Sequence, residues 1–226
     1  MIRSMTRSMI KPIITSLVNP DVGDPTGATE RYFAPLDDVL MSYYFYSTAI
    51  VLSAGDTFEL EFLAPSSVVS STETISDGET ASNRLRIQLA SDGTYRFPSP
   101  SAATLEVDGV VINSSSTYPI DGKQHKAKFT GVGTGVLKYL GVRYTIASYY
   151  SGIISNPIAT ISGVKTTNTL GLATGNSEPS AEANNTITYI NIPDSNRELY
   201  QLSVDETQWN NISPSPQELP SVIEIA

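Results

Sequence analysis

The sequence predicts an all-β protein built on an antiparallel β-sandwich, and three observations lead to this fold class. Its 226 residues include only 16% charged side chains but many Ser, Thr, Gly, Pro and Tyr residues, a composition that favours strands and turns over helices. Between about residues 47 and 163, short segments alternate apolar and polar residues with the period of two that is typical of half-buried strands. Asp-Gly dipeptides, which are strong turn signals, separate these segments.

The clearest predicted strands are residues 57–62 and 84–89, in which every second residue is apolar. The apolar side chains are expected to face the core and the polar ones to face solvent. Residues 105–112 are predicted to form a hairpin, because Asp108-Gly109 lies between two apolar runs. Glycines at positive φ are predicted in three further turns, at Asp77-Gly78, Asp92-Gly93 and Asp121-Gly122.

Residues 1–20 form a separate basic region, which we interpret as a docking arm. Arg3, Arg7 and Lys11 are spaced by four residues and no acidic residue accompanies them, whereas the whole chain has a net charge of −9. Because residues spaced by four lie on one side of a helix, an amphipathic helix is predicted up to Pro12. A secretory signal and an interfacial membrane helix are weaker alternatives, because the apolar residues do not form an uninterrupted run.

The rest of the chain divides into three predicted parts. Residues 21–46 are a connecting segment and residues 47–163 are the sandwich. Residues 164–226 are a C-terminal β extension, which contains a predicted strand at residues 186–192. This extension is too short for a core of its own, so we expect it to pack on the sandwich or on a neighbouring subunit.

Composition excludes several classes of function. A net charge of −9 and a pI of about 4.6 argue against a nucleic-acid partner, which would require a basic surface. The absence of cysteine excludes disulfide bonds and a thiol nucleophile. Because the chain has a single histidine, metal sites that need two histidine ligands are also excluded. No apolar run is long enough to span a membrane. We therefore expect no cofactor, no nucleic acid and no membrane insertion. Calcium stays open, because Asp21, Asp24, Asp37 and Asp38 offer oxygen ligands, but no loop has a recognisable ligand spacing and no metal site is assigned.

Four tyrosines are candidate contact residues. Their rings combine an apolar body with a polar tip, which suits both subunit interfaces and stacking on sugars. Strand alternation predicts that half of each adjacent pair faces the core. The candidates are Tyr43, Tyr44, Tyr149 and Tyr150.

Three segments resemble those of the laminin-G-like, concanavalin-type jelly rolls. Residues 121–127 (DGKQHKA) resemble a turn that leads into a strand, residues 137–141 (LKYLG) a strand that ends in glycine, and residues 150–158 (YSGIISNPI) a closing strand. The chain is also similar to structural proteins of tailed bacteriophages and prophages, which pair an N-terminal arm with such a jelly roll. The resemblance implies a jelly-roll topology and a structural role for the only histidine, His125.

This resemblance also implies a function in the virion. The expected role is a non-enzymatic tail fibre or adhesion appendage, a homotrimer that binds the host surface, with surface glycans as candidate ligands. Its arm would bind other virion proteins. A capsid decoration or head-fibre protein docked on the major capsid lattice is the alternative. A secreted carbohydrate-binding module is a further one, against which the missing signal peptide counts.

A polysaccharide hydrolase is an alternative of another class, and it depends on Glu59 and Glu61. These residues share one face of a predicted strand with Cα atoms about 6.8 Å apart, and glycoside hydrolysis uses two carboxylates. Glycosidases with concanavalin-like sheets carry E-x-D-x-x-E on a strand, whereas this chain has a second Glu and then Ala64. The competing interpretation places both carboxylates in solvent opposite Arg84 and Arg86, so we expect no enzymatic activity.

Overall fold

The computed structural model describes eight ranges of the chain and consists of strands, turns and loops. The ranges are 30–33, 35–97, 101–167, 170, 172–173, 187–190, 198–202 and 209–211. Within them lie sixteen β-strands and no helix, which confirms the predicted all-β class. The arm at residues 1–20 and most of the C-terminal extension lie outside the described residues.

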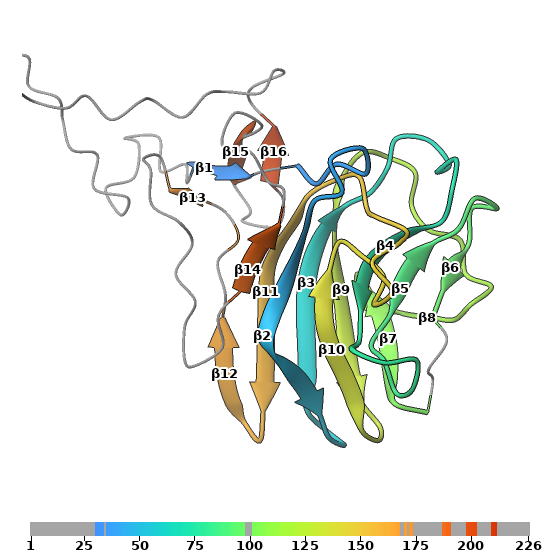
Figure 1. Ribbon diagram of the computed structural model, residues 1–226, viewed down its shortest axis with the longest axis vertical. Coiled ribbons are helices and arrows are strands. Elements are labelled where there is room, and N and C mark those ends of the chain that lie inside the picture. Colours follow the sequence, from blue (N-terminus) through green and yellow to red (C-terminus); the bar gives the residue numbers. More distant parts are fainter. Residues whose placement is uncertain are drawn as a thin grey trace, which may run out of the picture.

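Two six-stranded antiparallel sheets form the sandwich (Figure 1). The front sheet, nearer the viewer in Figure 1, comprises β14 (Ile187–Ile190), β2 (Tyr43–Leu52), β10 (Gly135–Leu140), β4 (Glu73–Asp77), β5 (Ile87–Leu89) and β6 (Tyr95–Arg96), in that order. The rear sheet comprises β12 (Val164–Thr167), β11 (Ile154–Ile161), β3 (Thr57–Leu63), β9 (Gln124–Gly131), β7 (Ala103–Val107) and β8 (Val110–Ile112). The β-sandwich is thus confirmed, and the finer jelly-roll topology stays a prediction.

A third, smaller sheet was not predicted from the sequence. It has the order β13 (Leu172–Ala173), β1 (Glu30–Phe33), β15 (Glu198–Leu202) and β16 (Trp209–Asn211). Strand β14, which the sequence predicts within residues 186–192, instead pairs with β2 at the edge of the front sheet. Strand β12, also in residues 164–226, is at the edge of the rear sheet, so the C-terminal extension contributes strands to all three sheets.

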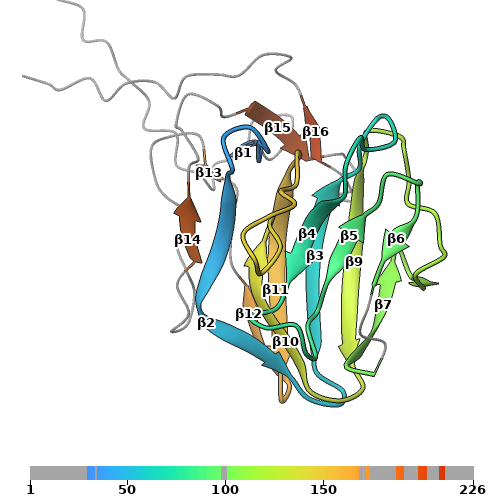
Figure 2. The same ribbon diagram turned by 45° about the vertical axis from the view of Figure 1, so that its right-hand side comes forward.

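The core lies between the front and rear sheets, which Figure 2 shows as two layers. In β3 the apolar residues Phe58, Leu60 and Phe62 are fully buried and the residues between them are half-buried, as the alternation predicts. Strand β5 differs, because Gln88 is buried as well and donates to Thr74 Oγ1 at 2.9 Å. Its second face is therefore covered rather than exposed to solvent.

Turn chemistry confirms most of the local predictions. Strands β7 and β8 form the predicted hairpin, and Asp108 and Gly109 both have positive φ, at 50° and 76°. The prediction for Gly78 was wrong, because this glycine is outside the positive-φ region. It is required for space, since a Cβ there would lie 2.6 Å from the Cβ of Arg84.

The sandwich also begins earlier than expected. Strand β2 starts at Tyr43, inside the segment 21–46 that was predicted to be a connection. The aromatic run at its start therefore belongs to the front sheet, where alternation sorts its side chains between the core and the outer surface.

Candidate functional site

Four aromatic side chains form a cluster on the outer surface of the front sheet, which we call the aromatic face: Tyr43, Phe45, Tyr139 and Tyr149. Tyr43 and Phe45 alternate along β2 with buried residues, so their rings point away from the core. Tyr139 on β10 is the cross-strand partner of Phe45. Tyr149 comes from the loop that follows β10.

The ring of Tyr43 lies at the centre of this cluster. Its centroid is 6.4 Å from that of Phe45, 6.5 Å from that of Tyr139 and 6.3 Å from that of Tyr149. The ring planes are tilted or edge-on, which are the arrangements that aromatic pairs favour. Burial, with Tyr149 and Tyr139 as neighbours, raises the pKa of Tyr43. The aromatic face is therefore a packed group whose members all keep partial exposure.

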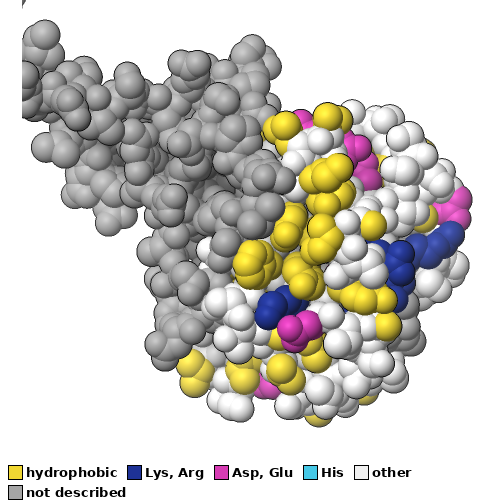
Figure 3. Space-filling model, viewed as in Figure 1, with side chains coloured by type: hydrophobic (Ala, Val, Ile, Leu, Met, Phe, Trp, Pro, Cys, Tyr) yellow, Lys and Arg dark blue, Asp and Glu magenta, His cyan; other side chains and the backbone are white. Residues whose placement is uncertain are grey.

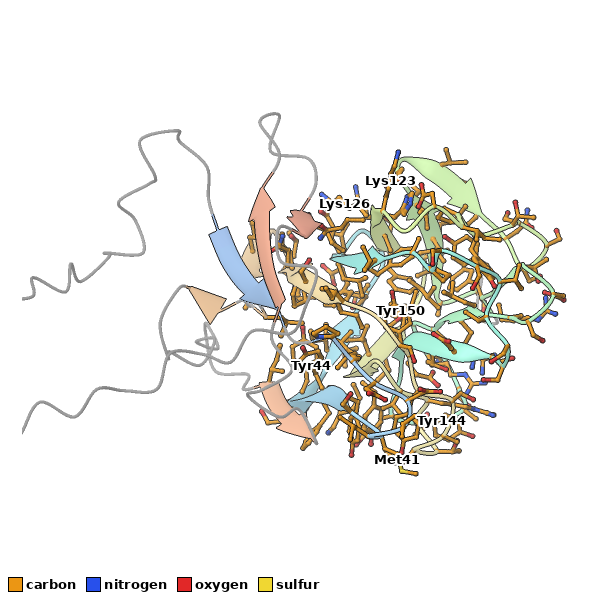
Figure 4. All side chains as sticks on the ribbon, turned by 90° about the horizontal axis from the view of Figure 1, so that it is seen from above. Met41, Tyr44, Lys123, Lys126, Tyr144 and Tyr150 are labelled. Carbon is orange, nitrogen blue, oxygen red and sulfur yellow. The ribbon has the colours of Figure 1, made fainter. Side chains whose placement is uncertain are left out.

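The structure confirms two of the four predicted contact tyrosines as surface residues. Tyr43 and Tyr149 lie together, whereas Tyr44 and Tyr150 are 1% and 0% exposed, which corrects their candidacy as contact residues and places half of each adjacent pair in the core, as alternation predicts. Tyr150 points between the sheets and its hydroxyl donates to the Leu63 carbonyl (Figure 4). Alternation explains both corrections, because adjacent residues of an extended chain face opposite sides.

Sequence reasoning missed the other two members. Phe45 carried a usable signal, because it stands two residues from Tyr43 in the same strand. Tyr139 carried none, because only the pairing of β10 with β2 brings it to Tyr43.

Hydrophobic side chains gather on this face of the molecule, where Lys and Arg side chains adjoin them (Figure 3). The rings of the aromatic face offer apolar surface together with phenolic hydroxyls. Tyr149 uses its hydroxyl to donate to the Ile146 carbonyl at 3.3 Å, which orients its ring. Such a surface can stack on sugar rings or bury against another protein, and its four side chains include no acid or histidine that could transfer a proton at neutral pH.

The glutamate pair lies on the outer surface of the rear sheet. Glu59 and Glu61 have Lys128 and Lys126 as cross-strand partners, and Lys126 Nζ is 2.5 Å from Glu59 Oε2. The interpretation that placed them opposite Arg84 and Arg86 was therefore wrong, because those arginines belong to the front sheet's β4–β5 region.

Hydrogen bonds hold Glu61 firmly. Its Oε2 accepts from Gln124 Nε2 at 2.7 Å, from Asn156 Nδ2 at 2.7 Å and from Ser155 Oγ at 3.1 Å. Burial raises the pKa of Glu61, and the bonds from Asn156 and Ser155 and the charge of Lys126 oppose that rise. Because three side chains converge on one carboxylate oxygen, we assign Glu61 the role of joining β3, β9 and β11.

His125 lies at the rim of the core beside Phe62, with ring centroids 5.9 Å apart. Its two nitrogens contact Asp108 and Asp121, which belong to two different turns. This position agrees with the structural role expected of it.

Within the described residues, no group of three or more His, Cys, Asp or Glu side chains could hold a metal ion. In the same part of the chain, no helix has the length and apolar character needed to cross a membrane. The predicted assembly residues Arg3, Arg7 and Lys11 lie outside the described residues. In comparisons with protein-family models, curated proteins and solved structures, nothing matches this chain.

Proposed function

We propose that this protein is a non-enzymatic binding module of a bacteriophage virion, a tail fibre or adhesion appendage that contacts surface carbohydrate of the host. The aromatic face is the observation that carries the binding role. It presents adjoining, partly exposed rings on one sheet of a rigid sandwich, so a sugar chain can stack there without a rearrangement of the backbone.

The virion assignment is supported by the similarity of the chain to structural proteins of tailed bacteriophages and prophages, which pair an N-terminal arm with a jelly roll. Residues 121–127, 137–141 and 150–158 resemble segments of the laminin-G-like, concanavalin-type jelly rolls. A sandwich with a basic leader suits display on a particle, with residues 1–20 binding another virion protein and three copies of the chain assembling together. Docking of the same arm on a capsid lattice, as in a decoration or head-fibre protein, is the alternative within this class.

Affinity electrophoresis tests the carbohydrate role directly. The full-length chain is run through gels that contain polysaccharides extracted from bacterial surfaces, beside Tyr43→Ala and Tyr149→Ala. We expect retardation by at least one polysaccharide, with affinity about tenfold lower in each variant, since a lost stacking contact costs about 1.4 kcal/mol. The matched control is Val111→Ala, an exposed apolar residue on β8 of the rear sheet. Equal retardation of all four proteins, or none with any polysaccharide, would contradict the proposal.

Two further measurements address assembly and activity. Mass spectrometry and labelled-antibody microscopy of purified phage particles should find the protein on the tail, and deletion of residues 2–20 should leave a folded protein that is missing from the particle. Incubation of the wild type and Glu61→Gln with the retarding polysaccharide should release no sugar in either case. Turnover that the variant lacks would establish the hydrolase alternative.

A further inference from the structure

Three arginines gather at one end of the front sheet of this otherwise acidic chain. Arg84 follows the loop after β4, Arg86 directly precedes β5, and Arg143 lies in the loop after β10. Two segments, the β4–β5 connection and the loop after β10, therefore bring their side chains together, although the protein as a whole has a net charge of −9.

The ring of Tyr144 lies close to the guanidinium groups of two of them. The guanidinium carbon of Arg84 is 5.0 Å from its centroid and that of Arg143 is 5.7 Å from it, both within cation–π range. Figure 4 shows Tyr144 on the outer side of the front sheet, away from Lys123 and Lys126 on the rear side. Arg84 is only 9% exposed, and Gly78 leaves the space that its backbone occupies.

One acidic side chain accompanies the arginines. Within the described residues, their only ion pair is between Arg84 Nε and Asp77 Oδ1, at 3.7 Å, which is too long for a hydrogen bond. Asp77 is fully buried and accepts from backbone amides instead, from Gly78 at 2.9 Å and from Tyr144 at 3.2 Å. Within the described residues, Asp77 is thus the one carboxylate that interacts with the charges of Arg84 and Arg86, and Arg143 adds a further positive charge beside Arg86.

Several donors of the cluster lack an acceptor. Nε of Arg84, Arg86 and Arg143 and Nη1 of Arg84 are buried and form no hydrogen bond within the described part of the chain. Buried polar atoms are almost always hydrogen-bonded in folded proteins. Burial and then the neighbouring Arg84 lower the pKa of Arg86 to about 10, so it still carries its charge at neutral pH.

We propose that Arg84, Arg86 and Arg143 form a binding site for a compact oxyanion, a carboxylate, phosphate or sulfate group. Such a group accepts several hydrogen bonds at once and matches the planar fork of guanidinium donors. It would satisfy the buried donors and balance the excess positive charge beside Asp77.

The site adjoins the aromatic face. Asp77 is the cross-strand partner of Tyr139, and a single short loop carries both Arg143 and Tyr149. We therefore assign the oxyanion to an acidic sugar of a polysaccharide whose neighbouring rings stack on the aromatic face, a step that rests on the proposed function.

Nuclear magnetic resonance of the ¹⁵N-labelled full-length protein tests the oxyanion site. Inorganic phosphate is added at constant ionic strength, with sodium chloride as the compensating salt, while the arginine Nε–Hε signals are followed. We expect saturable shifts for Arg84, Arg86 and Arg143. The signal of Arg96, which already pairs with Asp92 at 2.6 Å, should not move. Shifts that never saturate, or that equal those of Arg96, would overturn the site.

Variants provide a second measurement. Arg86→Gln and Arg143→Gln should each weaken phosphate binding at least tenfold, whereas Arg96→Gln should leave it unchanged. Backbone amide spectra report whether each variant is folded. If a variant does not fold, the titration of the wild-type protein still tests the site. Equal affinity in all three variants would overturn the assignment of these arginines.

Two further ligands identify the source of the anion. Oligogalacturonate, an acidic sugar chain, should bind more tightly than phosphate, and neutral maltooligosaccharide should bind less tightly than oligogalacturonate. Tyr149→Ala should weaken oligogalacturonate binding and leave phosphate binding unchanged. If Tyr149→Ala changes neither the affinity for oligogalacturonate nor that for phosphate, the acidic-sugar assignment and its link to the aromatic face fail, while the oxyanion site stands. If phosphate does not bind but neutral sugars do, the oxyanion site fails and the aromatic face stands.

Discussion

Nδ1 of the His125 imidazole lies 2.6 Å from Oδ2 of Asp108, which is in the turn between β7 and β8. Its other nitrogen, Nε2, lies 3.0 Å from Asp121 Oδ1, in the turn before β9. Ionised carboxylates only accept hydrogen bonds, so both ring nitrogens must carry protons for both contacts to form. In its protonated, positively charged form, His125 therefore links the two turns through both ring nitrogens.

This link predicts a stability that depends on pH. Burial opposes protonation of His125, but its hydrogen bonds to Asp108 and Asp121 prevail and raise its pKa above 6.5. A raised histidine pKa gives stability that is complete below the unfolded value of about 6.5 and is lost as pH rises through the folded pKa. Urea unfolding at pH 6 and pH 9 measures the free energy of unfolding of both proteins. The wild type should be more stable than His125→Gln, and the difference should be larger at pH 6 than at pH 9. Arg96→Gln should keep the wild-type pH dependence, and an unchanged dependence in His125→Gln would refute the charged link.

Removal of the Glu61 carboxylate should destabilise the rear sheet. Glu61→Ala removes the acceptor that Gln124, Ser155 and Asn156 share, although Gln124 Nε2 keeps its 2.7 Å bond to Ser155 Oγ. This loss should lower the free energy of unfolding by about 2 kcal/mol. Glu59→Ala is the matched control, because its partner Lys126 is largely exposed and such pairs contribute about 0.5 kcal/mol. Chemical denaturation of both variants measures the difference, and equal losses would show that the network does not stabilise the fold.

Gly152 should tolerate no side chain. A Cβ at this position would lie 2.6 Å from both Cζ and Oη of Tyr150, a ring that is fully buried between the sheets. Gly152→Ala should therefore cost about 1–3 kcal/mol of stability through overpacking. Ser151→Ala changes an exposed neighbour and should stay within about 0.5 kcal/mol of wild type. Thermal unfolding of the two variants separates the outcomes, and a stable Gly152→Ala protein would mean that the ring can move aside.

Phe129 tests whether the space between the two sheets is the core that holds the sandwich together. It is fully buried on β9, with its ring centroid 5.8 Å from that of Phe97. Phe129→Ala should lower the free energy of unfolding by about 3–5 kcal/mol, because the variant loses buried apolar surface and leaves a cavity between the sheets. Val111→Ala, at 65% exposure on β8, should change it by less than about 0.5 kcal/mol. Denaturant titration with intrinsic fluorescence or circular dichroism measures both.

Local patterns in the sequence were sufficient for the all-β class and for the elements that depend on near neighbours. The strand at residues 57–62 and the hairpin at residues 105–112 follow from period-two alternation and from one Asp-Gly turn. Alternation also separates Tyr43 from Tyr44, since it determines which face of a strand each side chain occupies.

What alternation cannot determine is which strand lies beside which. The contact between Tyr43 and Tyr139, the gathering of Arg84 with Arg143, and the donors around Glu61 all join residues at least 59 positions apart. Each depends on the pairing order of the sheets and on the loops that cross their ends. The composition and short-range pattern of this chain thus determined its class and its strands, whereas both candidate binding surfaces were decided by tertiary structure, because long-range pairing leaves no periodic mark in a single sequence.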